Sequence, residues 1–343
     1  MIINIRKRFI EPKKGIPVST DQISEVQSRI LKKLLTDGRK SVVEIAKELN
    51  LTNEAVKKNY CEMERKGIIN GATIHINYGD FGYKAVAHLM IRVDSSQADR
   101  LLESLKDMPE VYSIYKSGAA GNVDAILTLR SFQQLDDAKH KIKSQFSVSE
   151  MKTAIWTDVK EMHGNLGIFT HETVRNKDPI DCSKTKRSGI SKIAIDKIDQ
   201  KIADELAKDG RVSIATLAKE ADISPNNVRR RYEKLKKNGM LKVTIQIDPV
   251  KIGYQALAVF FAVTSNEDLS SIIAKIGSIP DVISIMKTSG DYDLQVYAMI
   301  RDLRQLLSIQ EELEKTRGIL KMDMELRKIP NKWPTPRQYI STF

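Results

Sequence analysis

The chain carries an internal repeat, and this feature limits its possible folds more than any other. The tripeptide Asp-Gly-Arg occurs at 37–39 and again at 209–211. Around these tripeptides, residues 30–67 align without gaps with residues 202–239. Self-similarity over such a length indicates that one structural unit is built twice. We therefore expect two copies of one architecture within the 343 residues.

Each copy begins with a region of helical periodicity. In the second copy, Ser213 is suited to cap a helix over 213–221. Ser224 is suited to cap the next helix, which Pro225 starts and Gly239 ends. Its apolar residues recur at i, i+4 and i+7 and form one stripe: Val228, Tyr232 and Leu235. Two helices followed by an amphipathic third predict a helix-turn-helix unit.

The rest of each copy alternates apolar runs of strand composition with helices. In the second copy the predicted elements are strand 256–264, helix 267–277, strands 282–288 and 292–299, helix 302–315 and strand 319–329. The order β-α-β-β-α-β is that of a ferredoxin-like domain. Because its two helices cover only one face of the sheet, we expect the free faces of the two copies to pack together as an internal pseudo-dimer.

The predicted fold class is therefore α+β, with two copies of a winged or three-helix helix-turn-helix unit followed by a ferredoxin-like β-α-β-β-α-β domain. The predicted domains are helix-turn-helix units at 20–72 and 192–244, ferredoxin-like effector and dimerisation domains at 73–163 and 245–330, a linker at 164–191 and a C-terminal tail at 331–343. The linker assignment depends on a composition rich in Gly, Asn, Thr and charged residues.

The chain has a formal net charge of +12. Such an excess favours a polyanionic partner, although a merely basic surface has the same composition. No run approaches the ~20 apolar residues of a membrane span, and the first 15 residues lack the apolar core of a signal peptide. We expect a soluble, cytoplasmic protein that does not bind membranes.

The third helix of a helix-turn-helix unit enters the DNA major groove. Asn can bind adenine there, Arg can bind guanine, and Lys near the far end can bind phosphate. The candidate DNA-binding residues are Ser224, Asn226, Asn227, Arg229, Arg230, Arg231, Lys234 and Lys237 in the second copy, and Thr52, Asn53, Lys57, Lys58 and Asn59 in the first. The alternative is a solvated charged face; the helix caps, the two preceding helices and the repeat favour double-stranded DNA.

Patterns that indicate catalysis or a cofactor are missing from the sequence. Cys61 and Cys182 are the two cysteines, too few for a disulfide framework or a Cys-rich zinc site. None of the five histidines has the spacing of a metal site, and His88 is expected to pack within a strand. We expect a protein that is not an enzyme and that needs no cofactor.

These motifs together resemble the Lrp/AsnC, or feast/famine, transcription regulators. The resemblance depends on the Asp-Gly-Arg tripeptides, the segment SPNNVRRRYEKLKKNG (224–239), IGYQA (252–256) and SGDYDL (289–294). It implies a ferredoxin-like domain that dimerises through its sheet, small effectors such as amino acids bound near domain interfaces, and self-association of dimers. In this chain both halves of such a dimer are expected in one polypeptide.

The resemblance also implies an effector site at the turn between the middle strands. The candidate effector-binding residues are Gly290, Asp291 and Asp293 in the second copy and Gly121 and Asp124 in the first. A carboxylate beside exposed backbone N–H groups could hold the ammonium and carboxylate of an amino acid. The alternative is a plain tight turn between two strands.

The two copies differ in the charge of their helix-turn-helix units. Residues 21–71 hold ten Lys and Arg against eight Asp and Glu, whereas residues 192–242 hold thirteen against eight. We therefore expect the second copy to bind DNA more strongly and the operator to be asymmetric.

Two other functions stay open. One alternative is a sirohaem decarboxylase, which shares this domain pairing, although the middle strands 111–118 and 282–290 contain no His. The other is a ligand sensor whose DNA binding has decayed.

Overall fold

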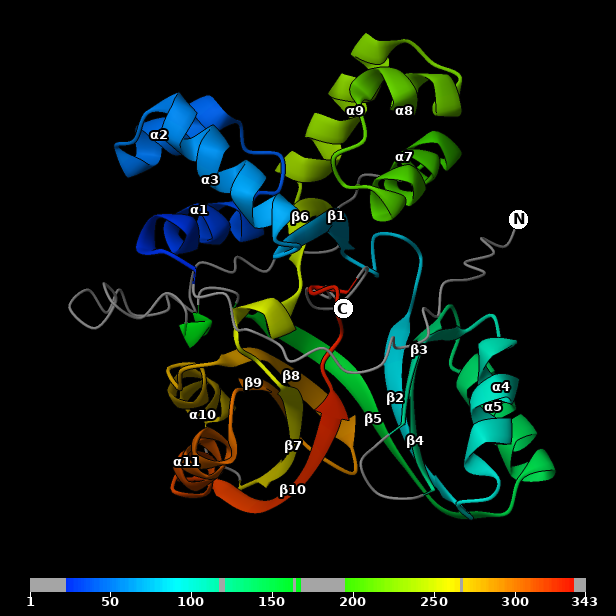
Figure 1. The fold of residues 1–343 in the computed structure, drawn as a ribbon. Coiled ribbons are helices and arrows are strands. Elements are labelled where there is room, and N and C mark those ends of the chain that lie inside the picture. Colours follow the sequence, from blue (N-terminus) through cyan, green and yellow to red (C-terminus); the bar gives the residue numbers. More distant parts are fainter. Residues whose placement is uncertain (1–22, 117–120, 163–164, 168–194, 266–267, 336–343) are drawn as a thin grey trace.

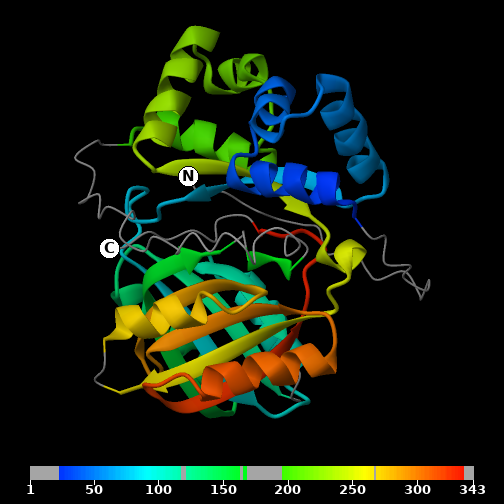
Figure 2. The same ribbon diagram turned by 90° about the vertical axis from the view of Figure 1, so that its left-hand side faces the viewer.

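The computed structural model describes residues 23–116, 121–162, 165–167, 195–265 and 268–335. The predicted linker, apart from 165–167, and the tail beyond 335 lie outside the described residues. The molecule has two layers, a helical layer and a layer of curved β-sheet (Figures 1 and 2). We refer to residues 25–161 as the first half and to residues 197–328 as the second half.

Within the described residues, the helical layer contains six helices in two groups of three. They are α1 (Glu25–Thr36), α2 (Val42–Leu49), α3 (Asn53–Arg65), α7 (Lys197–Lys208), α8 (Ile214–Ala221) and α9 (Pro225–Lys237). The predicted caps of the second group are confirmed, since Ser213 accepts a hydrogen bond from the N–H of Thr216 and Ser224 accepts one from that of Asn227. The predicted apolar stripe of α9 is buried: Val228, Tyr232 and Leu235.

A two-stranded antiparallel ribbon lies beneath these helices and joins the two halves. It pairs β1 (Ile69–Ile76) with β6 (Leu241–Ile247). The expected winged arrangement is therefore corrected, because the strand after α3 pairs with a strand of the other half and not with one of its own. The helices are exchanged as well: α1 lies against β6, and α7 lies against β1.

The Asp-Gly-Arg tripeptides lie where each first helix meets the ribbon strand of the other half. The N–H of Gly38 donates to the carbonyl oxygen of Val243 at 2.8 Å, and the N–H of Gly210 donates to that of Ala72 at 2.9 Å. A Cβ atom on Gly38 would lie 2.7 Å from the backbone of Thr244. Glycine is required there because the two backbones approach too closely for a side chain.

The second layer is one eight-stranded sheet in the order β10-β7-β9-β8-β5-β2-β4-β3. Its strands are β2 (Ala85–Val93), β3 (Val111–Lys116), β4 (Asn122–Leu129), β5 (Val148–Glu161), β7 (Ala256–Thr264), β8 (Val282–Gly290), β9 (Leu294–Ile300) and β10 (Ile319–Lys328). Helices α4 (Ala98–Lys106) and α5 (Gln133–Gln145) cover the outer side of one half of the sheet, and α10 (Leu269–Ile276) and α11 (Leu303–Glu314) cover the other (Figure 1). A short helix, η3 (Pro249–Ile252), precedes β7.

The element order β-α-β-β-α-β occurs in both halves, as expected, but the sheets are joined in a way that the sequence did not indicate. Strand β5 has 14 residues. Its first part pairs with β2, and its later residues, from Ala154 to Glu161, pair with β8 of the other half. The two four-stranded groups are therefore continuous, and the sheet curls so that its inner faces oppose each other (Figure 1).

Candidate nucleic-acid interface

Helix α9 presents a polar face opposite its buried stripe. Asn226, Arg229, Arg230 and Lys237 are exposed on this side of the helix, together with one carboxylate, that of Glu233. Asn227 is half-buried, and its Oδ1 accepts a hydrogen bond from Nη2 of Arg230 at 3.1 Å. The exposed side chains offer amide and guanidinium donors without a described partner that would bury them, which is the chemistry that DNA bases and phosphates accept.

Two further predicted residues of α9 lie at the edge of this face and contact α7. Nη1 of Arg231 lies 2.7 Å from Oδ2 of Asp196 and 2.7 Å from Oδ1 of Asp199. These hydrogen bonds, first that of Asp199, raise the pKa of Arg231 above its ordinary value. Lys234 is half-buried, with Nζ 4.0 Å from Oδ2 of Asp199. Arg231 therefore fastens α9 to the start of α7 and does not join the exposed group.

Helix α3 presents the predicted residues of the first half. Asn53, Lys57 and Lys58 are exposed, as is Thr52, whose hydroxyl caps the helix by accepting from the N–H of Ala55 at 3.1 Å. Asn59 is half-buried, and its Nδ2 donates to the carbonyl oxygen of Ala55 at 2.9 Å. Exposed carboxylates share the helix surface: Glu54 and Glu64. The cationic surface of α3 is thus diluted by acidic side chains.

Two arginines that were not predicted from the sequence connect these helices. Nε of Arg39 donates to the carbonyl oxygen of Gly210 at 2.8 Å, and its guanidinium lies 5.3 Å from the ring centroid of Tyr232 in α9. Nη1 of Arg211 donates to the hydroxyl of Tyr60 in α3 at 2.6 Å. Both arginines end the repeated Asp-Gly-Arg tripeptides, and this repetition was the signal that could have identified them.

The predicted effector turn of the second half is occupied by contacts within the chain. Gly290 has a φ of 135°, and a Cβ atom on it would lie 2.2 Å from the carbonyl oxygen of Thr153. Oδ2 of Asp291 accepts from the N–H of Thr153 at 2.8 Å, and Oδ2 of Asp293 accepts from the N–H of Thr264 at 2.7 Å. Both carboxylates thus serve strand pairing.

The two predicted effector residues of the first half, Gly121 and Asp124, have different surroundings. Gly121 has a φ of 81°, and a Cβ atom on it would lie 2.1 Å from the carbonyl oxygen of Val93. Its neighbours 117–120 lie outside the described residues. Asp124 is buried between the opposed inner faces of the sheet, with 1% exposure. Gly121 and Asp124 are both buried and therefore do not line one accessible surface.

Asp124 belongs to a buried polar cluster that joins the two halves. Its Oδ2 accepts from Nη2 of Arg327 at 3.0 Å, and its Oδ1 lies 3.1 Å from Nε2 of His88. Nδ1 of His88 lies 3.2 Å from Oε1 of Gln295, which also accepts from Nε1 of Trp156 at 3.2 Å. Burial acts to raise the pKa of Asp124, but Arg327 and His88 outweigh it and lower that pKa below its ordinary value.

A cavity of about 710 Å³ opens beside this cluster, between the first and second halves. Its volume is within the range of small-molecule sites. The charged residues of its lining are Arg92, Lys152, Lys321, Asp124, Glu150, Asp323 and Glu325. Phe261 and Tyr292 supply aromatic walls. The lining thus offers both cations and carboxylates around an apolar surface.

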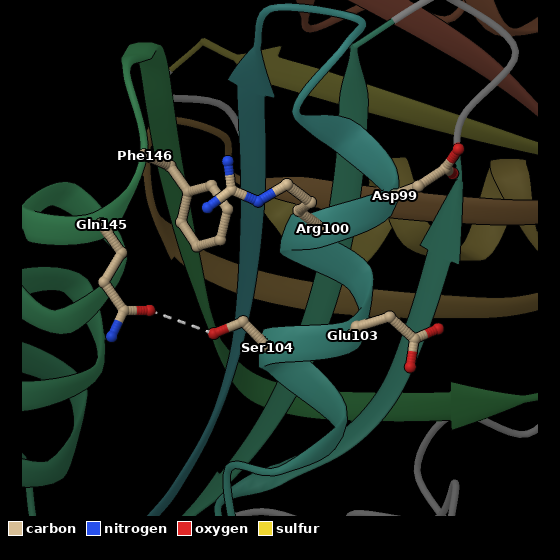
Figure 3. A pocket seen from close by; sticks show the side chains of 6 residues that line it. All are labelled: Asp99, Arg100, Glu103, Ser104, Gln145 and Phe146. Carbon is tan, nitrogen blue, oxygen red and sulfur yellow. Dashed lines mark hydrogen bonds between the residues drawn. The ribbon is translucent and has the colours of Figure 1, made fainter.

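A second hollow, of about 600 Å³, lies on the outer side of the first half between α4 and the end of α5 (Figure 3). Its lining consists of Asp99, Arg100, Glu103, Ser104, Gln145 and Phe146, and the hydroxyl of Ser104 donates to Oε1 of Gln145 at 3.2 Å. It contains none of the predicted site residues.

The part of the chain that the structure describes lacks two features that would bear on function. Within it, no three His, Cys, Asp or Glu side chains gather closely enough to hold a metal ion. Among the described helices, none combines the length and apolar character needed to span a bilayer.

Comparisons with known proteins agree with the helical and sheet elements. The family model of the AsnC-type helix-turn-helix domain matches residues 195–236, and that of the Lrp/AsnC ligand binding domain matches residues 258–326. The regulatory protein AsnC of Haemophilus influenzae is 30% identical over 137 residues, which cover 37% of this chain and 91% of AsnC. The HTH-type transcriptional regulator FL11 of Pyrococcus furiosus is 26% identical over 147 residues, which cover 40% of this chain and 97% of FL11.

Among solved structures, the siroheme decarboxylase NirDL resembles this chain over most of its length. The similarity covers 93% of this chain and 94% of NirDL, with a TM-score of 0.61 and 13% sequence identity. At that identity the likeness describes the fold alone.

Proposed function

The chain belongs to the Lrp/AsnC family of transcriptional regulators, and from this we propose that it binds double-stranded DNA in a sequence-specific manner as a covalent pseudo-dimer. The observation that carries the proposal is the exposed group on α9, where Asn226, Arg229 and Arg230 lie opposite a buried apolar stripe. This is the placement that major-groove recognition requires.

The pseudo-dimer is a duplication within one chain, with domains at the boundaries that the sequence predicts. Support comes from the order of elements, since α1 to β5 repeats as α7 to β10. The exchange of helices across the β1–β6 ribbon also supports it, because each three-helix unit completes its packing on a strand of the other half. The two units then present α3 and α9 to one duplex.

The operator is asymmetric because the two recognition helices differ. On α9 the positions that face outward carry Arg229 and Arg230, which can bind guanine with two hydrogen bonds each. On α3 the corresponding positions carry Lys57 and Lys58, with Glu54 nearby. Lysine is a point charge that suits phosphate more than a base edge. The second half therefore supplies most of the sequence specificity.

The cavity between the halves takes a small zwitterionic effector, such as an amino acid. The carboxylate of Glu325 suits an ammonium group, whereas Arg92 and Lys321 suit a carboxylate. Titrating the protein with single amino acids while recording the melting temperature tests this. A rise for one of them supports the cavity site if the variant Glu325→Gln abolishes it, and no shift with any of them contradicts it.

A sirohaem decarboxylase is the second candidate, since the similarity to NirDL extends over the whole fold. The lining of the cavity argues against it. Its four carboxylates, Asp124, Glu150, Asp323 and Glu325, outnumber its three cations, Arg92, Lys152 and Lys321. Such a surface lacks the excess of cations that favours an anionic tetrapyrrole. A stoichiometric absorbance shift on adding sirohaem would reverse this conclusion.

The variant Arg229→Ala/Arg230→Ala tests the DNA-binding proposal directly. Because each arginine supplies a base or phosphate contact, affinity for a selected DNA site is expected to fall about 10-fold or more. The slope of log affinity against log salt is expected to fall by about 0.9 for each phosphate that the variant no longer neutralises. The matched control is Lys141→Ala/Lys143→Ala, which removes two exposed charges from α5. Equal decreases in affinity for both variants would show that only net charge matters.

A further inference from the structure

The strand register identifies equivalent positions in the two halves of the sheet. Val86 pairs with Trp156 as Leu257 pairs with Arg327, so Trp156 and Arg327 are equivalent. In the same way, Met90 pairs with Asp124 as Phe261 pairs with Gln295.

Two equivalent contacts cross between the inner faces, and their chemistry differs. In one, Nη2 of Arg327 donates to Oδ2 of Asp124 at 3.0 Å, and both side chains are almost wholly buried. In the other, Nε1 of Trp156 donates to Oε1 of Gln295 at 3.2 Å. One contact is thus a buried ion pair, and its counterpart is a neutral hydrogen bond.

A further pair of equivalent residues, in the lining of the cavity between the halves, carries opposite charges. Lys152 pairs with Met90 as Asp323 pairs with Phe261, so Lys152 and Asp323 are equivalent. They carry opposite charges, and Nζ of Lys152 lies 3.9 Å from Oδ2 of Asp323. Positions that a symmetric dimer would occupy with the same residue therefore hold a cation in one half and an anion in the other.

A sheet built from two first halves, or from two second halves, would lack both the Arg327–Asp124 ion pair and the Lys152–Asp323 charge pair. Two first halves would oppose Asp124 to Trp156, leave that buried carboxylate without its guanidinium, and bring two copies of Lys152 together. Two second halves would oppose Arg327 to Gln295 and bring two copies of Asp323 together. Asp124 would then keep only His88, and Arg327 would keep only Glu325. Loss of the main partner of a buried charge is strongly unfavourable.

We infer that the inner faces of the sheet form an interface that pairs unlike halves and excludes like ones. The partner that the first half fits is the second half of this chain, or that of another copy, and not a second copy of itself. The inference builds on the two-copy organisation proposed above but is independent of DNA binding. Its consequence is that α3 is always paired with α9.

Full-length variants can reproduce the contacts of like halves. Asp124→Gln creates the Gln–Arg contact that two second halves would make, and Arg327→Trp creates the Asp–Trp contact that two first halves would make. Each is expected to lower the melting temperature by about 5–10 °C, because a buried charge loses its main partner. The double variant restores a neutral Gln–Trp contact and is expected to recover at least half of this decrease. If the decrease in melting temperature of the double variant equals the sum of the decreases of the two single variants, the inference is overturned.

Mixing the two single variants tests partner choice. Exchange of halves between an Asp124→Gln chain and an Arg327→Trp chain gives one Gln–Trp contact and one Asp–Arg contact, so both are matched. When the two differently tagged variants are refolded together, a species containing both chains is expected to melt above either variant alone. A mixture that melts as the two separate variants would contradict the inference.

The charge pair of Lys152 and Asp323 is partly exposed, so variants at these positions are expected to keep the fold intact. Lys152→Asp and Asp323→Lys each create a like-charge contact at partly exposed positions and are expected to lower the melting temperature by about 1–3 °C. The exchanged double variant Lys152→Asp/Asp323→Lys is expected to match the unmodified protein. A double variant that melts no higher than the single variants would count against charge complementarity.

Discussion

Arg39 and Arg211 occupy exchanged positions: Nε of Arg39 donates to the carbonyl oxygen of Gly210, and Nε of Arg211 donates to that of Gly38. Each guanidinium also lies over a tyrosine of the other unit's third helix, Tyr232 for Arg39 and Tyr60 for Arg211. The two arginines therefore fix α3 and α9 relative to each other. For the DNA binding proposed above, a rigid spacing between α3 and α9 is what contact with one duplex requires.

Removal of either arginine is expected to loosen this arrangement. Arg211→Ala removes hydrogen bonds to Gly38 and Tyr60 and is expected to lower the free energy of unfolding by roughly 1–3 kcal/mol. DNA affinity is expected to fall too, because the spacing of α3 and α9 is no longer fixed. Urea unfolding and DNA titration measure both effects, with Lys141→Ala as control. An affinity equal to that of the control would separate Arg211 from DNA binding.

The two recognition helices are expected to contribute unequally. Arg229→Ala/Arg230→Ala is expected to weaken DNA binding by about 10–100-fold and to relax sequence preference, because the variant cannot bind base edges through these arginines. Lys57→Ala/Lys58→Ala is expected to weaken binding less and equally for all sequences, since phosphate contacts carry no sequence information. Selection of bound sites from random DNA with each variant measures the sequence preference, and titration of a selected site measures the affinity. A perfect inverted repeat among the selected sites would disprove the asymmetry.

Arg231 is expected to act on stability. Arg231→Ala leaves the buried carboxylate of Asp199 without its main partner, and the free energy of unfolding is expected to fall by about 2–4 kcal/mol. Arg231→Lys keeps a charge but not the paired contacts to Asp196 and Asp199, so partial recovery is expected. Calorimetry gives the decrease, and DNA affinity at low temperature shows whether the folded variant still binds. A folded Arg231→Ala variant with unchanged stability would refute this role.

Stability is expected to fall as pH rises from about 4.5 to 7. Burial and the neighbouring Asp124 carboxylate raise the pKa of Glu325 from 4.5 to about 7, against the opposing effect of Arg327. In this window the folded protein binds a proton that the unfolded chain has released, so unfolding becomes easier as pH increases. The decrease in the free energy of unfolding is roughly 1–3 kcal/mol.

Glu325→Gln removes the titrating group and keeps its hydrogen-bonding shape. The free energy of unfolding of this variant is expected to change less between pH 4.5 and 7 than that of the unmodified protein. Urea unfolding at several pH values measures the difference. The same slope in both proteins would assign the titration to another group.

The residue sequence by itself determined the local elements. The helix over 225–237 follows from Ser224, Pro225 and the apolar stripe, since caps and periodicity act within a few residues. The strand 256–264 and the last strand near 319–329 were predicted from composition, and the structure places β7 and β10 there. The Lrp/AsnC resemblance depended on such local motifs, and the comparisons confirm the family.

Only the tertiary structure decided how distant residues are used. The pairing of β5 with β8, the exchange of Arg39 and Arg211, and the ion pair of Arg327 with Asp124 all join residues far apart in the chain. Asp291 and Asp293 were predicted to hold a ligand, yet their carboxylates are used by Thr153 and Thr264. A charge pattern shows which side chains are polar, but its partners depend on which strands lie side by side, and long-range packing sets that.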